Sequence, residues 1–301
     1  MNIGFVGLGK MGYNLVVNLL GHKHTVVGCD INPELVNLIK TEGATGVNSY
    51  PELFATMPKG PRTIWLMIPS GPLVDTVIGQ LLDAGLQSGD TVIDGGNSHY
   101  QDSIRRHGFL KEKGIGFVDC GTSGGTSGAL QGACTMYGGD PEVLAPLHDV
   151  FNDISVDNGA LYTGPAGSGH FTKMVHNGIE YGMMQSIAEG FEVMEKSPYP
   201  FDFEKVARLW NNGSVIRSWL MELTENAFSK DARLESIKGR MFSSGEGKWT
   251  LETALDLGVP TPVIALSLIM RYRSLQDDTF TGKVVAALRN EFGGHAIAKT
   301  D

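Results

Sequence analysis

The segment "NIGFVGLGKMGYNLVVNLL", residues 2–20, decides the fold of the first half of this chain. An apolar stretch leads into the pattern Gly-x-Gly-x-x-Gly at residues 7–12, and apolar residues at helical spacing follow. The pattern alone is a weak indication. Here it follows a strand-like segment, opens a helix-like one and precedes a second strand-like segment, "TVVGCD" at 25–30. This context predicts a βαβ unit that binds a dinucleotide.

The glycines of this loop have separate physical roles. Gly7 permits a tight turn, Gly9 lets the backbone approach a pyrophosphate, and Gly12 lets the helix pack closely on the strand. The start of the helix offers unpaired N–H groups and positive potential to the phosphates. The predicted cofactor-binding loop comprises Gly7, Leu8, Gly9, Lys10, Met11 and Gly12.

Asp30 ends the second strand-like segment, twenty-one residues after Gly9. A carboxylate at this spacing accepts hydrogen bonds from the adenosine ribose and repels a 2′-phosphate, and no arginine follows it in "INP" at 31–33. The sequence therefore predicts NAD as the cofactor, with NADP possible but disfavoured. An alternative remains, in which the glycines form an ordinary turn and Asp30 caps a helix.

The remaining sequence predicts an α/β domain followed by an all-α domain. Strand-like runs recur at 63–69, 90–96, 115–121 and 134–139, separated by helical or loop segments, which is typical of a Rossmann-like doubly wound, largely parallel sheet. From about residue 166 the strand pattern gives way to helical periodicity. We expect a cofactor-binding domain at 1–165 and a helical substrate and oligomerisation domain at 166–301.

Composition narrows the class of protein. With 42% hydrophobic and 19% charged residues, the chain is expected to fold as a soluble globular protein. A net charge of −9 argues against binding nucleic acid or anionic membranes, and apolar runs of about nine residues are too short to span a bilayer. No secretion signal is evident, and Cys29, Cys120 and Cys134 are interpreted as reduced core residues. We expect a cytoplasmic location.

The predicted helix at 167–185, "GSGHFTKMVHNGIEYGMMQ", has an unusual polar stripe. Positions i, i+3, i+4, i+7 and i+8 share one face of a helix. A solvated face is the ordinary interpretation of such a stripe. A mixture of an amine, an imidazole, an amide, a carboxyl and a phenol instead favours proton transfer and substrate binding. The stripe consists of Lys173, His176, Asn177, Glu180 and Tyr181.

Two polar loops follow the predicted strands at the edge where such sheets bind ligands. "GGNSH" at 95–99 contains Asn97, and "GTSGG" at 121–125 contains Ser123, Gly124 and Gly125. An amide, a hydroxyl and exposed backbone N–H groups suit a carboxylate or hydroxyl of a small anion. The same residue types also form ordinary turns.

Taken together, "GLGKMG", "GTSGG", "KMVHNGIEYGMMQ", "GKWT" and "RNEFGGH" resemble 6-phosphogluconate dehydrogenase in its short-chain form, within the 3-hydroxyacid dehydrogenase superfamily. The resemblance covers nearly the whole chain. It implies oxidative decarboxylation of 6-phosphogluconate to ribulose 5-phosphate and CO2 with reduction of NAD, in gluconate metabolism and the pentose phosphate pathway. It also implies a reaction without a metal ion.

The same resemblance assigns roles to residues. Lys173 is the implied base for the C3 hydroxyl and Glu180 the implied acid, with Asn177 beside them. A lysine base must be neutral at some moment, so its pKa of about 10.4 in water must fall. The residues implied at the carboxylate and hydroxyl end of the substrate are Asn97, Ser123, Gly124, Gly125, His176 and Asn177. Asn97 is also an implied cofactor-binding residue.

The implied phosphate ligands are Tyr181, Arg271, Arg289 and His295. The last two are implied to come from the C-terminal tail of a partner subunit. The resemblance therefore implies a homo-oligomer, dimeric or tetrameric. Long-chain members place Lys and Thr where this chain has Ser244 and Glu246, and Lys248 or Arg273 could substitute for them.

Two other functions stay open at this point. One is an NAD-dependent 3-hydroxyacid dehydrogenase acting on an unphosphorylated substrate. The other, from a different class, is a non-catalytic NAD-binding sensor.

Overall fold

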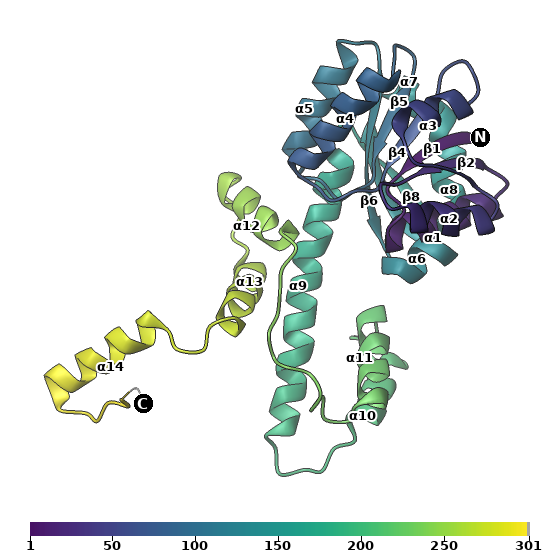
Figure 1. The fold of residues 1–301 in the computed structure, drawn as a ribbon. Coiled ribbons are helices and arrows are strands. Elements are labelled where there is room, and N and C mark those ends of the chain that lie inside the picture. The colour runs from purple at the N-terminus through teal and green to yellow at the C-terminus, as the bar shows by residue number, and fades with distance from the viewer. Residues whose placement is uncertain (300–301) are drawn as a thin grey trace. The chain divides into compact units, whose positions relative to one another are not determined.

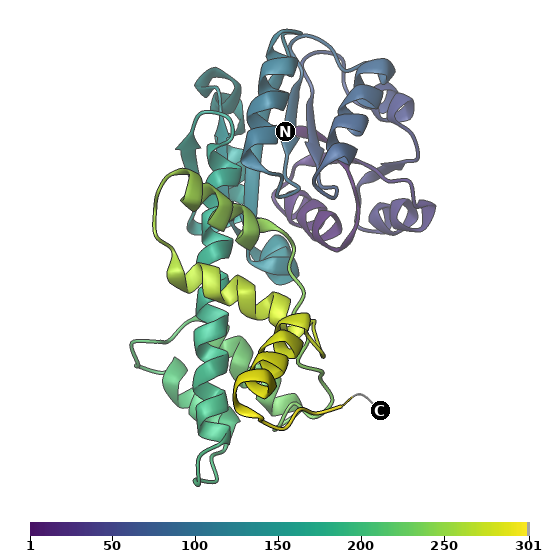
Figure 2. The same cartoon turned by 90° about the vertical axis from the view of Figure 1, so that its left-hand side faces the viewer.

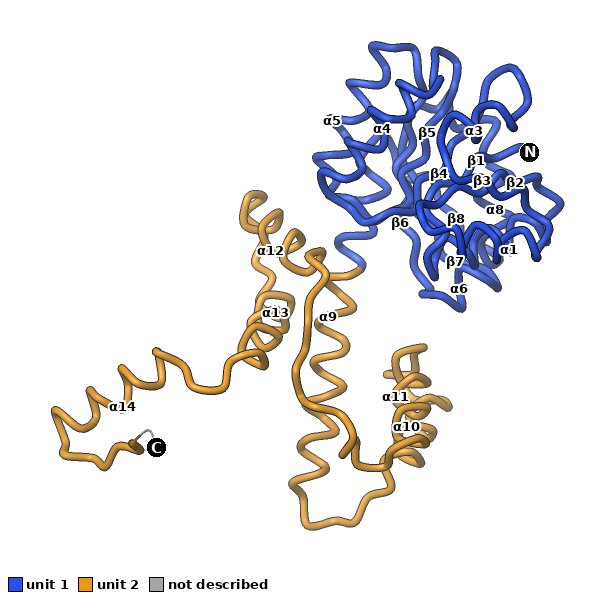
Figure 3. The backbone as a smooth tube through the Cα atoms, in the orientation of Figure 1, with its two compact units in different colours: residues 1–176 blue, residues 177–301 orange. Residues whose placement is uncertain are grey.

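The computed structural model describes residues 1–299. These residues divide into two compact units at the boundary between residues 176 and 177 (Figure 3). We call them unit 1 and unit 2. The division falls inside one long helix, α9 (Ser168–Glu195). The predicted division at 165/166 lies just before the first residue of that helix.

Unit 1 contains an eight-stranded sheet with the strand order β3-β2-β1-β4-β5-β6-β7-β8. Every neighbouring pair is parallel except β6 and β7, which are antiparallel. The predicted Rossmann-like, largely parallel sheet is confirmed. The strands are β1 (Asn2–Val6), β2 (Thr25–Cys29), β3 (Thr45–Val47), β4 (Thr63–Leu66), β5 (Thr91–Asp94), β6 (Gly116–Ser123), β7 (Ala133–Gly139) and β8 (Ser155–Gly164).

Helices cover both faces of this sheet, because alternate residues of each buried strand point to opposite faces (Figure 1). On β1, Ile3 and Phe5 join a core with α1, α2, α6 and α8, whereas Val6 joins a core with α3, α4 and α5. The helices are α1 (Lys10–Gly21), α2 (Pro33–Thr41), α3 (Tyr50–Thr56), α4 (Pro72–Ala84), α5 (Tyr100–Lys111), α6 (Gly125–Gln131), α7 (Pro141–Leu144), the 3-10 turn η1 (Ala145–Leu147) and α8 (His148–Asp153).

The cysteine prediction is right for two residues and wrong for one. Cys29 and Cys120 are free and buried in the two cores, and burial raises the pKa of both thiols, that of Cys29 to about 11. Cys134 is exposed. It is the second residue of β7, so its side chain points away from the face occupied by its buried neighbours Ala133 and Thr135.

Unit 2 is helical, as the periodicity predicts. Its other helices are α10 (Phe203–Asn211), α11 (Trp219–Lys230), α12 (Glu246–Asp256), α13 (Pro262–Ser274) and α14 (Phe280–Gly293). Aromatic side chains of α9, α10 and α11 form one small core around Phe191, Phe203 and Phe228. The helices α12 and α13 pack across α9, where Gly178 and Gly182 permit close contact with Thr250 and Val263 (Figures 1 and 2). No helix within residues 1–299 is long and apolar enough to cross a membrane.

Candidate active site

A pocket of about 330 Å³ lies at the carboxyl edge of the sheet in unit 1. The predicted glycine loop forms one wall of it. Gly7 has a φ of +97°, which favours glycine, and a Cβ on Gly12 would overlap the Gly7 carbonyl oxygen. Only glycines therefore allow α1 to start this close to β1. The pocket is lined by Gly9, Lys10, Met11, Gly12, Met67, Ile68, Gly95, Gly96, Asn97 and Thr122.

The start of α1 fits the phosphates of a dinucleotide. Gly9 is the N-cap residue and no side chain caps the helix, so the first-turn N–H groups lack the acceptor that a capping side chain supplies. A Cβ on Gly9 would meet nothing within 4 Å, so there is open space in front of this backbone. An anion could approach the amides directly.

Asp30 is held at the same edge by two backbone amides. Its carboxylate accepts hydrogen bonds from the Leu8 N–H at 2.7 Å and the Asn32 N–H at 2.8 Å. The N-cap of α2 is Asn32, whose side chain accepts from the Glu34 N–H at 2.9 Å. Asp30 is therefore not the N-cap residue of that helix; it ties the glycine loop to the turn after β2.

Asn97 lies in the loop that follows β5. Its backbone has a φ of +53°, in the left-handed region that non-glycine residues rarely adopt. Its side-chain oxygen accepts a hydrogen bond of 3.5 Å from the Thr122 N–H on β6. Such local strain persists where the surroundings fix it, and is common at ligand sites.

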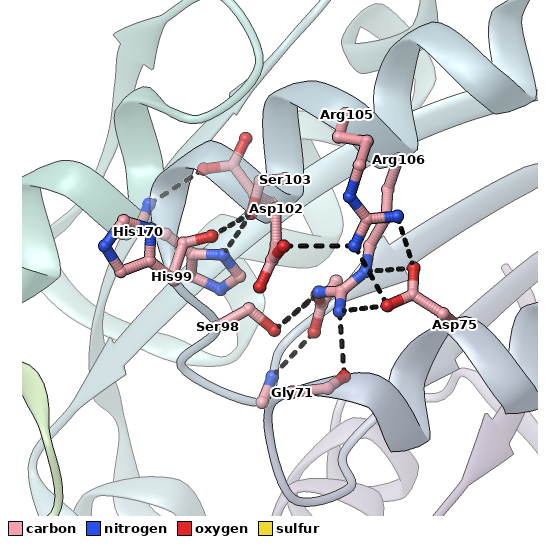
Figure 4. A network of polar contacts seen from close by, with 12 residues as sticks. Gly71, Asp75, Ser98, His99, Asp102, Ser103, Arg105, Arg106 and His170 are labelled. Atoms are coloured by element: carbon pink, nitrogen blue, oxygen red, sulfur yellow. Dashed lines mark hydrogen bonds and ion pairs between the residues drawn. The ribbon is translucent and has the colours of Figure 1, made fainter.

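A buried ion pair behind this loop, between Arg106 and Asp94, holds the loop in place (Figure 4). Arg106 is 1% exposed, and its guanidinium makes five hydrogen bonds: two to Asp75 and one each to Asp94, Ser98 and the Gly71 carbonyl. Asp94 in turn accepts from the Gly96 N–H at 3.2 Å and the Ser98 hydroxyl at 2.7 Å. Burial opposes ionisation of Asp75, but Arg105 and Arg106 outweigh it and lower the pKa of that carboxyl to about 2.

The start of α9 brings three predicted residues together within unit 1. The Lys173 amine lies 3.4 Å from Nδ1 of His176, and Nε2 of His176 lies 3.1 Å from the Ser123 hydroxyl. Gly124, with a φ of +113°, and Gly125 turn the chain from β6 into α6 immediately after Ser123. An amine, an imidazole and a hydroxyl in sequence can exchange protons.

Three residues of the polar stripe of α9 are buried, and the other two, His176 and Glu180, are partly buried. Lys173 is 6% exposed in unit 1, and Asn177 and Tyr181 are 9% and 5% exposed in unit 2. Ile179 and Met183, on the apolar side, are 54% and 41% exposed. A solvated face would expose its polar side chains, so that interpretation is wrong for Lys173, Asn177 and Tyr181.

Within unit 2, Arg271 and Tyr181 are in direct contact. The Arg271 guanidinium lies 3.6 Å from the centre of the Tyr181 ring, and the Tyr181 hydroxyl accepts from the Ser244 N–H at 3.3 Å. Gly247 packs against the same ring, where a Cβ would come within 2.6 Å of Tyr181 Cδ2. A cation, a phenol and a serine hydroxyl form a group that can bind an anion.

The other predicted phosphate residues are placed differently. Arg289 and His295 are exposed on or just after α14, a helix without a single buried residue. Lys248 pairs with Glu252 at 3.3 Å, and Arg273 donates to the Gln276 carbonyl at 2.7 Å. Glu246 is the first residue of α12 and 8% exposed, and its Oε2 is a buried atom with no hydrogen-bond partner among the described residues.

Sequence reasoning missed several residues around these sites. Met67, Ile68 and Thr122 line the unit 1 pocket, and Arg106 and Asp119 support its surroundings. Asp119 could have been noticed as a lone charge inside the strand "GFVDCGTS". Arg106 gives no such signal, because arginine is an ordinary residue on a helix surface.

Comparison with known proteins gives one family for both halves of the chain. Residues 2–164 match the family model for the NAD binding domain of 6-phosphogluconate dehydrogenase. Residues 169–286 match the model for the C-terminal domain of 6-phosphogluconate dehydrogenase.

Individual relatives agree with these models. YqeC of Bacillus subtilis, provisionally named a 6-phosphogluconate dehydrogenase, is 59% identical over 299 residues, which is 99% of this chain and 100% of YqeC. The NAD(+)-dependent, decarboxylating 6-phosphogluconate dehydrogenase of Haloferax volcanii is 40% identical, with 100% of both chains covered. A solved structure of the Plasmodium falciparum enzyme, described with NADP+ and with 6-phosphogluconate, gives a TM-score of 0.83 at 31% identity; the match covers 100% of this chain and 66% of that one.

Proposed function

Because the chain belongs to the 6-phosphogluconate dehydrogenase family, we propose that it catalyses the oxidative decarboxylation of 6-phosphogluconate to ribulose 5-phosphate and CO2, with NAD as the oxidant. The observation that carries the proposal is the buried Lys173 amine within 3.4 Å of His176, which itself contacts Ser123. The family assignment makes the chain an oxidoreductase with an NAD(P)-binding domain. The reaction and the choice of NAD are the proposal.

The cofactor would be held by the glycine loop at 7–12 and by Asp30. Bound nicotinamide would supply the acceptor for the hydride that leaves C3 of the substrate. Lys173, which is 6% exposed, takes the C3 hydroxyl proton, a step that needs the neutral amine. Since the 3-keto acid that results loses CO2 once its keto oxygen is hydrogen-bonded, the protonated Lys173 also assists decarboxylation.

The remaining groups complete the reaction. Glu180 lies seven residues after Lys173 on α9, about two helical turns, and protonates C1 of the enediol left by the departing CO2. Asn177 and His176 orient the substrate hydroxyls, while Asn97, Ser123, Gly124 and Gly125 bind its carboxylate. Tyr181 and Arg271 bind the phosphate, supported by their contact within unit 2.

The test of this proposal compares substrates. Initial rates are measured with 6-phosphogluconate, gluconate and 3-hydroxyisobutyrate, each with NAD and with NADP, while evolved CO2 is trapped. We expect turnover and stoichiometric CO2 only with 6-phosphogluconate. Equal turnover of an unphosphorylated acid without CO2 would make the chain a 3-hydroxyacid dehydrogenase, and absence of turnover with intact NAD binding would make it a sensor.

Cofactor preference follows from Asp30. We expect wild-type kcat/KM for NAD to exceed that for NADP by about tenfold or more, since the fixed carboxylate repels a 2′-phosphate. Asp30→Ser should reduce this ratio by about tenfold, measured from initial rates with both cofactors. Asp83→Ser, which removes an exposed carboxylate from α4, is the matched control and should leave the ratio unchanged. A wild-type preference for NADP contradicts the argument.

A homo-oligomer is proposed because α13 and α14 expose a large apolar surface. Leu266 and Ile269 of α13 are 60% and 52% exposed, and Leu288 and Phe292 of α14 are 57% and 77% exposed. Figure 1 shows α14 standing apart from the other helices of unit 2. An isolated helix of 14 residues is marginal in water, so α14 requires a covering surface. A second copy of the chain would supply it.

Subunit complementation tests whether the tail completes a partner's site. Lys173→Ala and Arg289→Ala are each expected to be inactive. Mixed after dissociation and reassembly, they should regain about one quarter of wild-type activity, because half of the dimers pair one intact base with one intact tail. Mass in solution, from light scattering, should be a multiple of 32.4 kDa. Failure to complement despite subunit exchange would place Arg289 in its own chain's site.

A further inference from the structure

The first turn of α9 is capped by a carboxylate from the sheet. Asp119 of β6 is 0% exposed, and its two oxygens accept hydrogen bonds from the Gly167 N–H at 2.6 Å and the His170 N–H at 2.8 Å. The Ser168 hydroxyl, a possible local cap, instead lies 2.9 Å from the Thr163 hydroxyl. The N–H groups that open a helix need an acceptor from outside the helix, and here a residue about fifty positions earlier provides it.

The same strand sets the position of the residues that follow. Asp119, Gly121 and Ser123 alternate along β6 and therefore share one face. Asp119 binds the amide of His170, a Cβ on Gly121 would overlap Lys173, and Ser123 contacts the His176 ring. Every second residue of this part of β6 thus contacts every third residue along the start of α9.

Close packing makes this arrangement specific. A Cβ on Gly169 would lie 2.6 Å from the carbonyl oxygens of Asp119 and Met136, and one on Gly138 would lie 2.5 Å from the Ser168 hydroxyl. The helix backbone therefore rests on the backbones of β6 and β7. With so little space, the bonds to Asp119 fix both the axial position and the rotation of the first turn.

We propose that Asp119 is a positioning residue, which holds the start of α9 on β6 so that the Lys173 amine and the His176 ring stand in the geometry needed for proton transfer. The proposal rests on the function proposed above. Burial raises the pKa of the Asp119 carboxyl, and the nearby His170 and the two backbone N–H groups act against that shift. Asp119 itself touches no reacting atom in this scheme.

Asp119→Asn is the informative variant because it preserves shape but points an NH2 group at one of the two amide donors. Displacement of the first turn should reduce kcat about 10- to 100-fold, since misplacement by about 1 Å has effects of that size. Affinity for NAD, measured by fluorescence titration, should stay within about twofold, because the glycine loop belongs to other elements. If the asparagine variant does not fold, Asp119→Ser replaces it in these measurements. Serine retains one oxygen acceptor and has no NH2 group that would point at an amide donor.

Asp90→Asn is the matched control. Asp90 is also buried, at 1% exposure, and also accepts two backbone N–H groups, from Arg62 at 2.9 Å and Gln87 at 3.0 Å. It precedes β5 at the opposite edge of the sheet. Asp90→Asn should lower the free energy of unfolding without changing kcat per folded molecule.

A second readout does not depend on the substrate. The rate at which fluorodinitrobenzene labels Lys173, followed by peptide mass spectrometry, should rise by about threefold or more in Asp119→Asn, as the loosened turn exposes the amine. It should not change in Asp90→Asn. If wild-type enzyme ignores 6-phosphogluconate while labelling still rises, the proposed function fails and the positioning role stands. Unchanged labelling, kcat within about twofold of wild type, or equal losses in both variants would overturn the role of Asp119.

Discussion

Replacing Lys173 by alanine should lower kcat by about 10³-fold or more while the dissociation constant for NAD stays within about twofold. Lys173 is the only lysine of α9, is 6% exposed, and contacts His176 at 3.4 Å. Under the proposed mechanism it takes the hydroxyl proton and then assists loss of CO2, so both chemical steps fail together. Stopped-flow reduction of NAD and CO2 release would both measure the loss.

Two further variants make this result specific. Lys173→Arg retains the positive charge but cannot lose a proton near neutral pH, so it should be about as inactive as the alanine variant. Lys205→Ala removes an exposed lysine of α10, which pairs with the N-cap residue Asp202, and should leave kcat unchanged. An alanine variant that retains more than about a tenth of wild-type kcat would exclude Lys173 as the base.

Local patterns in the sequence are sufficient to predict six of the eight strands and the glycine loop. Gly7 and Gly12 are required by backbone geometry within one turn, so their spacing between a strand-like and a helix-like segment predicts that turn. The short β3 and the irregular β8 were not among the predicted strands. Both lie at the edges of the sheet, and β8 alternates weakly because half of its residues are exposed and none is buried.

Sequence reasoning was less informative wherever a contact joins distant segments. The stripe on α9 could be recognised, but nothing local shows that its residues are buried rather than solvated. Asp119 and His170 lie 51 residues apart, and their hydrogen bond depends on the way α9 returns to β6. Cys134 was misplaced because burial of a strand residue depends on what covers each face of the sheet.

Arg106 is the clearest case of such a long-range contact, and its removal should have the largest effect on stability. All five of its N–H donors are used, and they join α4, β5 and α5 beneath the loop that carries Asn97. Arg106→Met should therefore lower the free energy of unfolding by about 3–5 kcal/mol, because Asp94, at 0% exposure, loses its buried positive partner. Urea denaturation followed by fluorescence measures this difference.

A variant of the neighbouring Arg105 shows how much stability is lost when an exposed arginine is removed instead of a buried one. Arg105 also binds Asp75, but its side chain is 56% exposed, so Arg105→Met should cost less than about 1 kcal/mol. Adding Asp94→Asn to Arg106→Met should recover part of the loss, because the unpaired buried charge is then absent. Equal costs for the two arginines, or no recovery in the double variant, would mean that the unpaired charge of Asp94 is not what destabilises Arg106→Met. Since the Asp94–Arg106 pair holds Gly96 and Ser98 on either side of Asn97, Arg106→Met should also weaken the affinity for the substrate.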